Sequence, residues 1–133
     1  MSRAKIMIVD DAPDLCRAQK LRLRANEYDT VHAEDGYSAL AVAQKEQPNL
    51  IILDLGLPAG DGFVVLKRLQ DSDALSRIPV IVLSAREAQV HEGPSLKAGA
   101  VAYFQKPADN GELLEVIRAS LDATTPTVGR LPA

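Results

Sequence analysis

The stretch Leu50-Ile51-Ile52-Leu53-Asp54 places four consecutive apolar residues before a carboxylate. Such a run, without polar alternation, is typical of a strand buried on both faces in a parallel sheet covered by helices. Similar runs rich in β-branched residues occur at Lys5–Val9, Thr30–Ala33, Pro79–Leu83 and Val101–Phe104. The chain is therefore expected to form five buried strands.

Segments with helical spacing separate these runs. Residues 13–25 begin with Pro13, which is tolerated at a first helical position, and have apolar side chains at positions 15, 18, 21 and 25. Residues 109–121 begin with the capping-box pair Asp109 and Glu112. Two further helices are expected over residues 37–46 and 61–70. Strands and helices thus alternate, which predicts an α/β fold with a doubly wound, five-stranded parallel sheet.

The composition is that of one globular domain. Of 133 residues, 47% are hydrophobic and 25% are charged, and 15 basic against 18 acidic side chains give a net charge of −3. This charge argues against a surface that coats nucleic acid and against a polybasic membrane anchor. A single cysteine, Cys16, excludes an internal disulfide and suits a reducing compartment. The apolar runs are too short to cross a bilayer and the N-terminus does not resemble a secretory signal, so a cytoplasmic location is expected.

Polar side chains follow the predicted strands at the edge where open α/β sheets bind ligands. Asp10 and Asp11 follow the first strand, Asp54 the third, Ser84 the fourth and Lys106 the fifth. Three neighbouring carboxylates repel one another unless a cation lies between them. Mg²⁺ prefers oxygen ligands, uses one or two carboxylates and recruits phosphate oxygens. With Mg²⁺ and Lys106 the local charge approaches zero, so the site is expected to accept a phosphoryl group.

Each of these residues also has a simpler explanation. Acidic residues before Pro13 fit a helix start, because they favour helix N-termini. Asp54 fits a turn, Ser84 a helix cap and Lys106 a solvated surface. Their joint occurrence at the ends of four strands favours the functional interpretation.

Short motifs extend beyond these polar residues. They are Val9-Asp10-Asp11, Pro13-Asp14-Leu15, Ala33-Glu34-Asp35-Gly36, Ala39-Leu40, Pro48–Leu55, Leu57-Pro58, Asp61-Gly62, Ile78–Ala85, Ala98-Gly99-Ala100 and Lys106-Pro107. In this order and spacing they make residues 4–122 resemble the receiver domain of two-component response regulators. The resemblance implies a flavodoxin-like (βα)5 sandwich with strand order 2-1-3-4-5 and a phosphorylated signalling protein.

The resemblance also implies a role for each residue at the strand ends. Asp54 is the expected phosphoacceptor. Mg²⁺ or Mn²⁺ is expected to bind directly to Asp11, to Asp54 and to the backbone carbonyl of Gly56. It is expected to contact Asp10 through a water molecule.

The phosphoryl group is expected to have its own set of contacts. By the same resemblance, Lys106 pairs with it, Ser84 hydrogen-bonds to it, and the amide of Ala85 donates to it. Tyr103 is the aromatic residue whose rotamer follows Ser84, and the bond before Pro107 is expected to be cis.

Partners follow from the same resemblance. A sensor histidine kinase or phosphotransfer protein is expected to supply the phosphoryl group, which switches the face of helix four, strand five and helix five toward an output domain or protein. A phosphorylation-dependent homodimer is a further expectation, whereas nucleic-acid binding, membrane binding and classical enzyme activity are not expected. Residues 1–122 are expected to form the domain. Residues 123–133, with two prolines and three threonines, form a flexible tail or the start of a linker.

Three other classes of protein share parts of this pattern. A metal-dependent phosphohydrolase with an aspartyl nucleophile needs a second aspartate two residues later, where Gly56 stands. A binding module that had lost phosphorylation would be expected to lack an acidic ligand, the acceptor or Lys106, and all are present. A flavodoxin-like cofactor binder needs a phosphate-binding loop where Asp10 and Asp11 would repel phosphate.

The chain departs from the family pattern at several positions. Asn26 and Glu27 occupy a turn that usually contains glycine, and Asn26 is expected to adopt the left-handed conformation. Ala108 stands where phenylalanine is common, and Val101-Ala102 where a polar pair is usual. Gly56 has no side chain to orient an attacking water, so the sequence leaves the dephosphorylation rate open.

The most unusual departure is Gly93-Pro94 within the fourth helix. An interior proline costs about 3 kcal/mol, and glycine costs roughly 1 kcal/mol relative to alanine. The expectation is a loop or irregular turn over residues 86–92 and a short helix from Pro94 to Ala98. This would expose Val101 and Tyr103 and make the switch face more mobile.

The remaining reactive side chains receive no role in the chemistry. Cys16 has no partner in the sequence pattern, and His32 and His91 lack the spacing of metal ligands, so all three are expected to pack or to lie at the surface. The basic residues of the first helix form an expected solvated face that, by the resemblance, also docks a kinase; they are Arg17, Lys20, Arg22 and Arg24.

Overall fold

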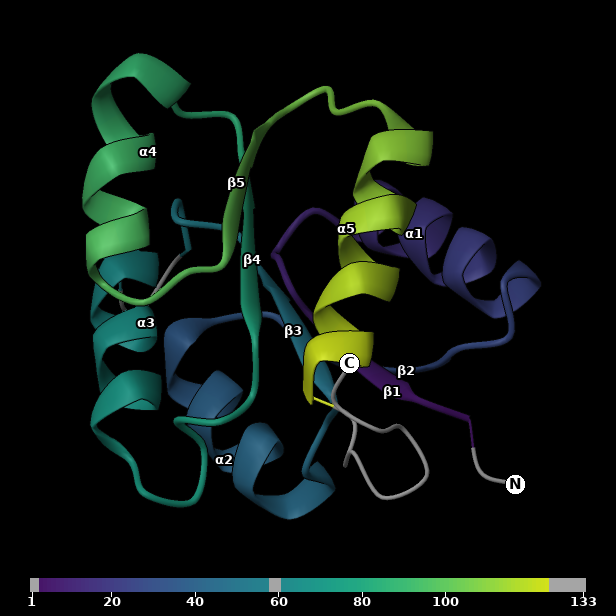
Figure 1. The fold of residues 1–133 in the computed structure, drawn as a ribbon, viewed down its shortest axis with the longest axis horizontal. Coiled ribbons are helices and arrows are strands. Elements are labelled where there is room, and N and C mark those ends of the chain that lie inside the picture. Colours follow the sequence, from purple (N-terminus) through teal and green to yellow (C-terminus); the bar gives the residue numbers. More distant parts are fainter. Residues whose placement is uncertain (1–2, 58–60, 125–133) are drawn as a thin grey trace, which may run out of the picture.

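The computed structural model describes residues 3–57 and 61–124, in which five strands and five helices alternate (Figure 1). The strands are β1 Lys5–Val9, β2 Asp29–Ala33, β3 Leu50–Leu53, β4 Val80–Ser84 and β5 Ala102–Gln105. The helices are α1 Pro13–Ala25, α2 Gly36–Glu46, α3 Gly62–Asp71, α4 Ala88–Lys97 and α5 Asn110–Thr124. The strand ends lie within one residue of the predicted ones. Among the described residues, no helix has the length and apolarity needed to cross a membrane.

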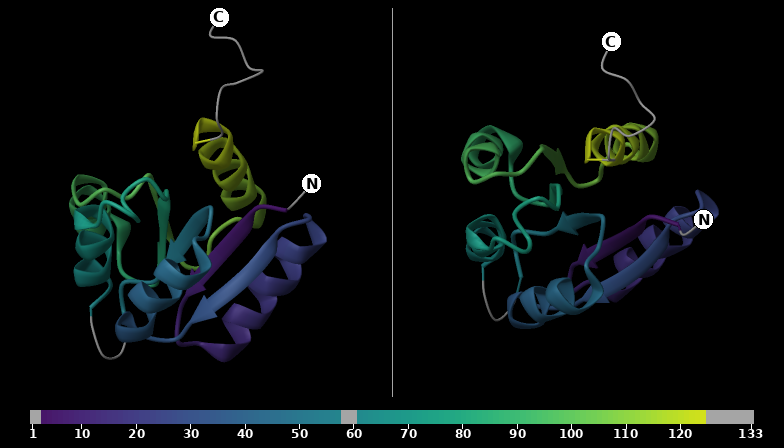
Figure 2. Two further views of the ribbon diagram at one scale, coloured as in Figure 1. Left: turned by 90° about the horizontal axis from the view of Figure 1, so that it is seen from below. Right: turned by 60° about the horizontal axis from the view of Figure 1, so that its bottom comes forward.

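The strands form one parallel sheet in the order β2-β1-β3-β4-β5, as predicted. Helices α1 and α5 cover one face, and α2, α3 and α4 cover the other (Figures 1 and 2). Successive residues of β3 alternate between the two apolar cores: Ile51 and Leu53 pack against α2 and α3, while Leu50 and Ile52 pack against α1 and α5. Because both faces are buried, the strand needs an unbroken apolar run.

Aspartate side chains fix the starts of three helices. The Oδ1 atoms of Asp35, Asp61 and Asp109 accept hydrogen bonds from backbone amides of the first turn of α2, α3 and α5, at 2.7, 2.8 and 2.9 Å. α5 continues to Thr124, so residues 123 and 124, expected in the tail, are helical. The rest of the predicted tail lies outside the described residues.

Helix α4 contradicts the sequence-based expectation. It is continuous from Ala88 to Lys97 with Pro94 in its interior, so the predicted loop over residues 86–92 is wrong from residue 88 onward. Gly93 has no Cβ to collide with the proline ring, and this reduces the steric restriction that normally keeps the residue before proline out of a helix. The absence of this clash partly offsets the low helix propensity of glycine at position 93.

Hydrogen bonds hold the C-terminal turn of α4 beyond the proline. The buried Ser95 hydroxyl donates to the carbonyl of His91 at 2.7 Å. Gly99, at φ 112°, ends the helix in a Schellman motif, in which the amide of Ala100 donates to the carbonyl of Ser95 at 3.0 Å. Tyr103, expected to be exposed, is 9% exposed, while Val101 is 50% exposed.

The turn after α1 also differs from the expectation. Glu27, at φ 67°, adopts the left-handed conformation, and Asn26, at φ −98°, does not. The Nδ2 atom of Asn26 instead donates to the carbonyl of Arg22 at 2.9 Å. Asn26 therefore caps α1 with its side chain, and the reversal of the chain falls on the next residue.

Gly62 brings the start of α3 against the backbone that follows β3. Its amide donates to the carbonyl of Leu55 at 2.9 Å. A Cβ atom at position 62 would lie within 3 Å of the backbone of Asp54 and Leu55. Only glycine allows this approach.

We expect Gly62→Ala to lower the free energy of unfolding by about 2–3 kcal/mol, because the added methyl group must displace backbone atoms. Gly93→Ala is the matched control, since a Cβ there would meet nothing within 4 Å apart from its two chain neighbours and the backbone of its own helix. Its gain in helix propensity and its clash with Pro94 oppose each other, so its stability should change by less than about 1 kcal/mol. Urea denaturation measures both, and equal effects would contradict the close approach at Gly62.

Replacing Pro94 by alanine should stabilise the chain by about 1–3 kcal/mol. The new amide lies one turn after the carbonyl of Val90 and can complete the helical hydrogen-bond ladder. Urea denaturation with a constant m-value would report the gain. A loss of stability would show that the proline ring contributes packing that outweighs the restored hydrogen bond.

Candidate functional site

Three carboxylates meet at the carboxyl-terminal edge of the sheet. Val9 and Leu53 are in register as the last residues of β1 and β3, and the amide of Asp54 donates to the carbonyl of Val9 at 2.9 Å. One ligand oxygen from each of Asp10, Asp11 and Asp54 lies within 4.8 Å of the others. The structure therefore brings the predicted acidic residues together.

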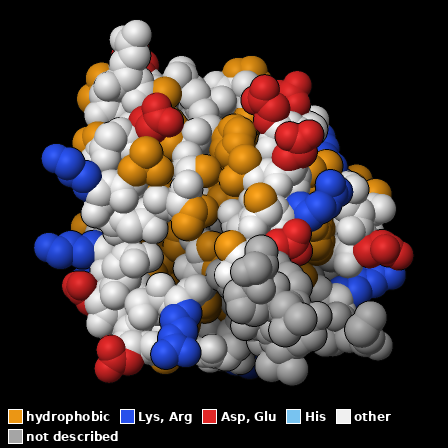
Figure 3. Space-filling model, viewed as in Figure 1, with side chains coloured by type: hydrophobic (Ala, Val, Ile, Leu, Met, Phe, Trp, Pro, Cys, Tyr) orange, Lys and Arg blue, Asp and Glu red, His pale blue; other side chains and the backbone are white. Residues whose placement is uncertain are grey.

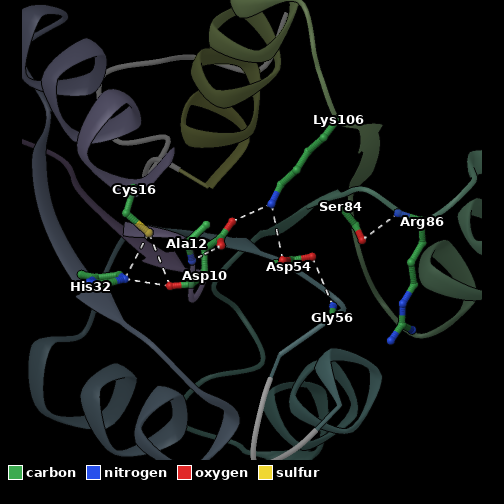
Figure 4. A network of polar contacts seen from close by, with 9 residues as sticks. All are labelled: Asp10, Ala12, Cys16, His32, Asp54, Gly56, Ser84, Arg86 and Lys106. Atoms are coloured by element: carbon green, nitrogen blue, oxygen red, sulfur yellow. Dashed lines mark hydrogen bonds and ion pairs between the residues drawn. The ribbon is translucent and has the colours of Figure 1, made fainter. Parts of the chain in front are cut away.

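The Lys106 ammonium lies between two of these carboxylates (Figure 4). Its Nζ atom is 2.8 Å from Asp10 Oδ2 and 3.4 Å from Asp54 Oδ2. Asp10 and Asp54 are 3% and 9% exposed, whereas Asp11 is exposed. The predicted lysine thus reaches the site from the loop after β5, across the sheet from β1.

The charged groups of the site leave a net negative charge that favours a bound cation. Burial alone lowers the pKa of the Lys106 ammonium, but its hydrogen bond and ion pair with Asp10, together with the charge of Asp54, raise the pKa overall. Three carboxylates and one ammonium still leave a formal charge of −2. An acidic triad of hard oxygen donors is typical of a Mg²⁺ site, so the donor set fits this ion.

Backbone amides hold two of the carboxylates. Asp10 Oδ1 accepts from the amide of Ala12 at 2.9 Å, and Asp54 Oδ1 accepts from the amide of Gly56 at 3.2 Å. These bonds orient the remaining lone pairs of both side chains. The carbonyl of Gly56 as a metal ligand stays a prediction.

Ser84 and Tyr103 are both connected to the backbone of Arg86. Ser84 is buried at the end of β4, and its Oγ atom accepts from the Arg86 amide at 3.2 Å. Tyr103 points inward, its hydroxyl donates to the Arg86 carbonyl at 2.6 Å, and burial raises its pKa. The Arg86 side chain lies 3.5 Å from the Asp61 carboxylate. Two predicted residues therefore share a partner that the sequence did not indicate, while the role of the Ala85 amide stays a prediction.

The Lys106–Pro107 bond is cis, as predicted.

Cys16 and His32, which received no role from the sequence, contact Asp10 (Figure 4). The Nε2 atom of His32 lies 2.9 Å from the Asp10 carbonyl oxygen, and the Cys16 Sγ atom lies 3.4 Å from it. Burial, with the Asp10 carboxylate, raises the pKa of the Cys16 thiol to about 11, so the thiol keeps its proton at neutral pH. The in-register pairing of Ile8 with His32 places His32 near the end of β1, and the residue types alone do not reveal this register.

Comparisons with known proteins agree with this geometry. The chain is similar to Response regulator PleD from Caulobacter vibrioides, with 34% identity over 116 residues that cover 87% of this chain and 26% of PleD. It is also similar to the DNA-binding dual master transcriptional regulator RpaA from Synechocystis, with 38% identity over 120 residues that cover 90% of this chain and 50% of RpaA. The chain thus spans a quarter to a half of the length of these relatives.

A similar solved structure holds a magnesium ion. The receiver domain of a sensor histidine kinase from Pseudomonas aeruginosa, with a magnesium ion coordinated in its active site cleft, has a TM-score of 0.83 and 26% identity. The match covers 91% of this chain and 99% of that one. The family model of the response regulator receiver domain matches residues 6–118. With its parallel sheet and acidic pocket, the chain belongs to this family, the phosphoacceptor domains of two-component signalling.

Proposed function

We propose that Asp54 accepts a phosphoryl group from a phosphohistidine of a partner protein, with a divalent cation bound beside it. The observation that carries this proposal is the meeting of three carboxylates next to the Lys106 ammonium. Phosphoryl transfer depends on positioning and on neutralising the charge that spreads over the phosphoryl oxygens. A cation and an ammonium beside a buried carboxylate supply that neutralisation.

Asp11, Asp54 and the carbonyl of Gly56 are the proposed direct ligands of Mg²⁺ or Mn²⁺, and Asp10 acts through water. The exposed Asp11 side chain has room to turn toward the cation. Lys106 Nζ lies closer to Asp10 Oδ2, at 2.8 Å, than to Asp54 Oδ2, at 3.4 Å, so Asp10 is the more strongly paired carboxylate, which suits an indirect ligand. When bound, the cation neutralises charge and orients the phosphoryl oxygens.

In the proposed step, a carboxylate oxygen of Asp54 attacks phosphorus in line with the phosphorus–nitrogen bond of the phosphohistidine, which breaks. The imidazole leaves with the bonding electrons and takes a proton from solvent. Lys106 exchanges its contact with Asp54 Oδ2, now 3.4 Å, for a phosphoryl oxygen. The Ser84 hydroxyl and the Ala85 amide donate to the other phosphoryl oxygens.

Arg86 is the proposed link between this site and the face formed by α4, β5 and α5. Its amide is bound to Ser84 Oγ and its carbonyl to the Tyr103 hydroxyl. When Ser84 Oγ turns toward a phosphoryl group, its bond with the Arg86 amide breaks. The β4–α4 segment and Tyr103 are therefore proposed to shift together.

The same face presents apolar side chains to solvent. Val90 and Leu96 on α4, and Val101 just before β5, are exposed. Figure 3 shows hydrophobic side chains gathered between α4 and α5. Such a patch favours protein contact. We propose that an output domain, a partner protein or, after phosphorylation, a second copy of the chain binds here.

The organisation of the whole protein belongs to the proposal as well. Residues 1–122 are proposed as the receiver domain, with the segment after them as a tail or the start of a linker. A sensor histidine kinase or phosphotransfer protein is the proposed donor, and the cytoplasm the proposed location.

Incubation with acetyl phosphate and Mg²⁺ should add one acid-stable, base-labile phosphoryl group at Asp54, because the site can position and neutralise it. Intact-protein mass spectrometry measures the labelling. Asp54→Asn should abolish it. Asp71→Asn, which changes an exposed carboxylate at the end of α3, should leave labelling as in the original chain. Full labelling of Asp54→Asn would overturn the proposal.

Lys106→Ala should keep some labelling but lose the conformational response, because the phosphoryl group then lacks its ammonium partner. Without Mg²⁺ this change should also cost about 3 kcal/mol of stability, since it leaves two buried carboxylates side by side. Lys5→Ala, which breaks a pair with Glu46 that is one-third exposed, should cost about 0.5 kcal/mol. Urea denaturation in chelator distinguishes the two, and equal losses would contradict the buried ion-pair network.

A further inference from the structure

The backbone carbonyl of Asp10 occupies an unusual position. The β1–β2 ladder ends with Val9 paired to Ala33, and the amide of Asp10 still donates to the Ala33 carbonyl at 3.1 Å. The Asp10 carbonyl oxygen lies beyond the ladder, in a residue that is buried. A buried carbonyl needs hydrogen-bond donors, and here they come from side chains.

His32 and Cys16 are those donors. A carbonyl oxygen can only accept, so the 2.9 Å contact requires that His32 Nε2 carries the hydrogen. The Cys16 thiol reaches the same oxygen at 3.4 Å, and the sulfur and Nε2 atoms lie 3.2 Å apart. One donor comes from the edge strand β2 and the other from α1, so they approach the oxygen from different elements (Figure 4).

The planarity of the peptide bond transmits this contact to Asp11. The Asp10 carbonyl and the Asp11 amide belong to one rigid plane, which also contains the Cα atom of Asp11. Hydrogen bonds that fix the carbonyl oxygen therefore fix the plane of this peptide and the position of the Asp11 Cα atom, so that only the φ and side-chain torsions of Asp11 remain to direct its carboxylate. The Asp10 carboxylate is anchored separately, by the Ala12 amide and by Lys106.

We propose that His32, assisted by Cys16, is a positioning residue for the divalent cation. It orients the Asp10–Asp11 peptide so that the Asp11 carboxylate faces Asp54. His32 touches neither the cation nor the phosphoryl group. This inference rests on the proposed function, because it needs Asp11 as a metal ligand. Groups that orient metal ligands typically change metal affinity 10- to 100-fold when they are removed.

The surroundings of His32 make the proposal testable without unfolding the chain. His32 is exposed, and its side chain borders a cavity of about 290 Å³ that Asp11 and Arg17 also line. Removing the imidazole therefore forfeits little apolar packing. Cys16, in contrast, belongs to the core under α1, so its conservative replacement by serine, which keeps a donor, is the suitable second variant.

The experiment compares His32→Ala, His32→Gln and Cys16→Ser with the original chain. Calorimetric titration with Mg²⁺ measures cation affinity in the unphosphorylated protein, and the Mg²⁺ dependence of acetyl phosphate labelling gives the half-saturating concentration and the maximal rate. His32→Ala should weaken Mg²⁺ binding about tenfold with little change in the rate at saturating Mg²⁺. His32→Gln, which keeps an N–H donor, and Cys16→Ser, which keeps a hydroxyl donor, should each retain most of the Mg²⁺ affinity of the original chain. His91→Ala, which removes the other histidine, on α4 beside Phe63, should bind Mg²⁺ as the original chain does.

The outcomes separate this inference from the proposed function. If the original chain is labelled and binds Mg²⁺, but His32→Ala binds it equally well, the positioning role is overturned and the proposed function stands. A His32→Gln variant as weak as His32→Ala would equally overturn it, because the hydrogen bond would then not be the cause. A lower melting temperature with unchanged Mg²⁺ affinity would assign His32 a structural role only. Failure of the original chain to bind Mg²⁺ would overturn both proposals.

Discussion

The repulsion between the Asp10 and Asp54 carboxylates is the constraint on which the functional end of this molecule depends. Parallel pairing of β1 with β3 forces the two side chains to the same edge, and burial prevents water from screening them. The Lys106 ammonium between them compensates one charge. The remaining negative charge, together with that of the exposed Asp11, is typical of a site for a divalent cation. Stability and binding chemistry are thus two aspects of one charge distribution.

Most of the fold and of the acidic site was predictable from the sequence, because both follow from rules that act over short stretches. Unbroken apolar runs such as Leu50–Leu53 indicate strands buried on both faces, and residues directly after such strands must meet at one edge. Helix α4 was not predictable in this way. Helix propensities include the cost of Pro94. They include neither the absence of a Cβ clash at Gly93 nor the hydrogen bonds made by Ser95 and Ala100.

Two of the contacts that the sequence did not indicate share a physical cause: in each, a side chain binds a backbone atom far away in the chain. His32 binds the carbonyl of a residue 22 positions earlier, and Tyr103 binds the carbonyl of Arg86 17 positions earlier. Backbone atoms are the same at every position, so such a bond leaves no second residue type and no spacing to detect. Only the strand register and the rotamers define the partner.

The bond between Lys106 and Asp10 joins residues 96 positions apart, and the contact with Asp54 spans 52. This has a consequence for synthesis on the ribosome, where the N-terminal part of a chain emerges first. β1 and β3 can pair before β5 exists, but their two aspartates then lack the ammonium that makes their burial tolerable. The acidic pocket is therefore completed only when the last strand joins the sheet. An incomplete chain emerging from the ribosome does not yet offer a finished acceptor to a phosphodonor.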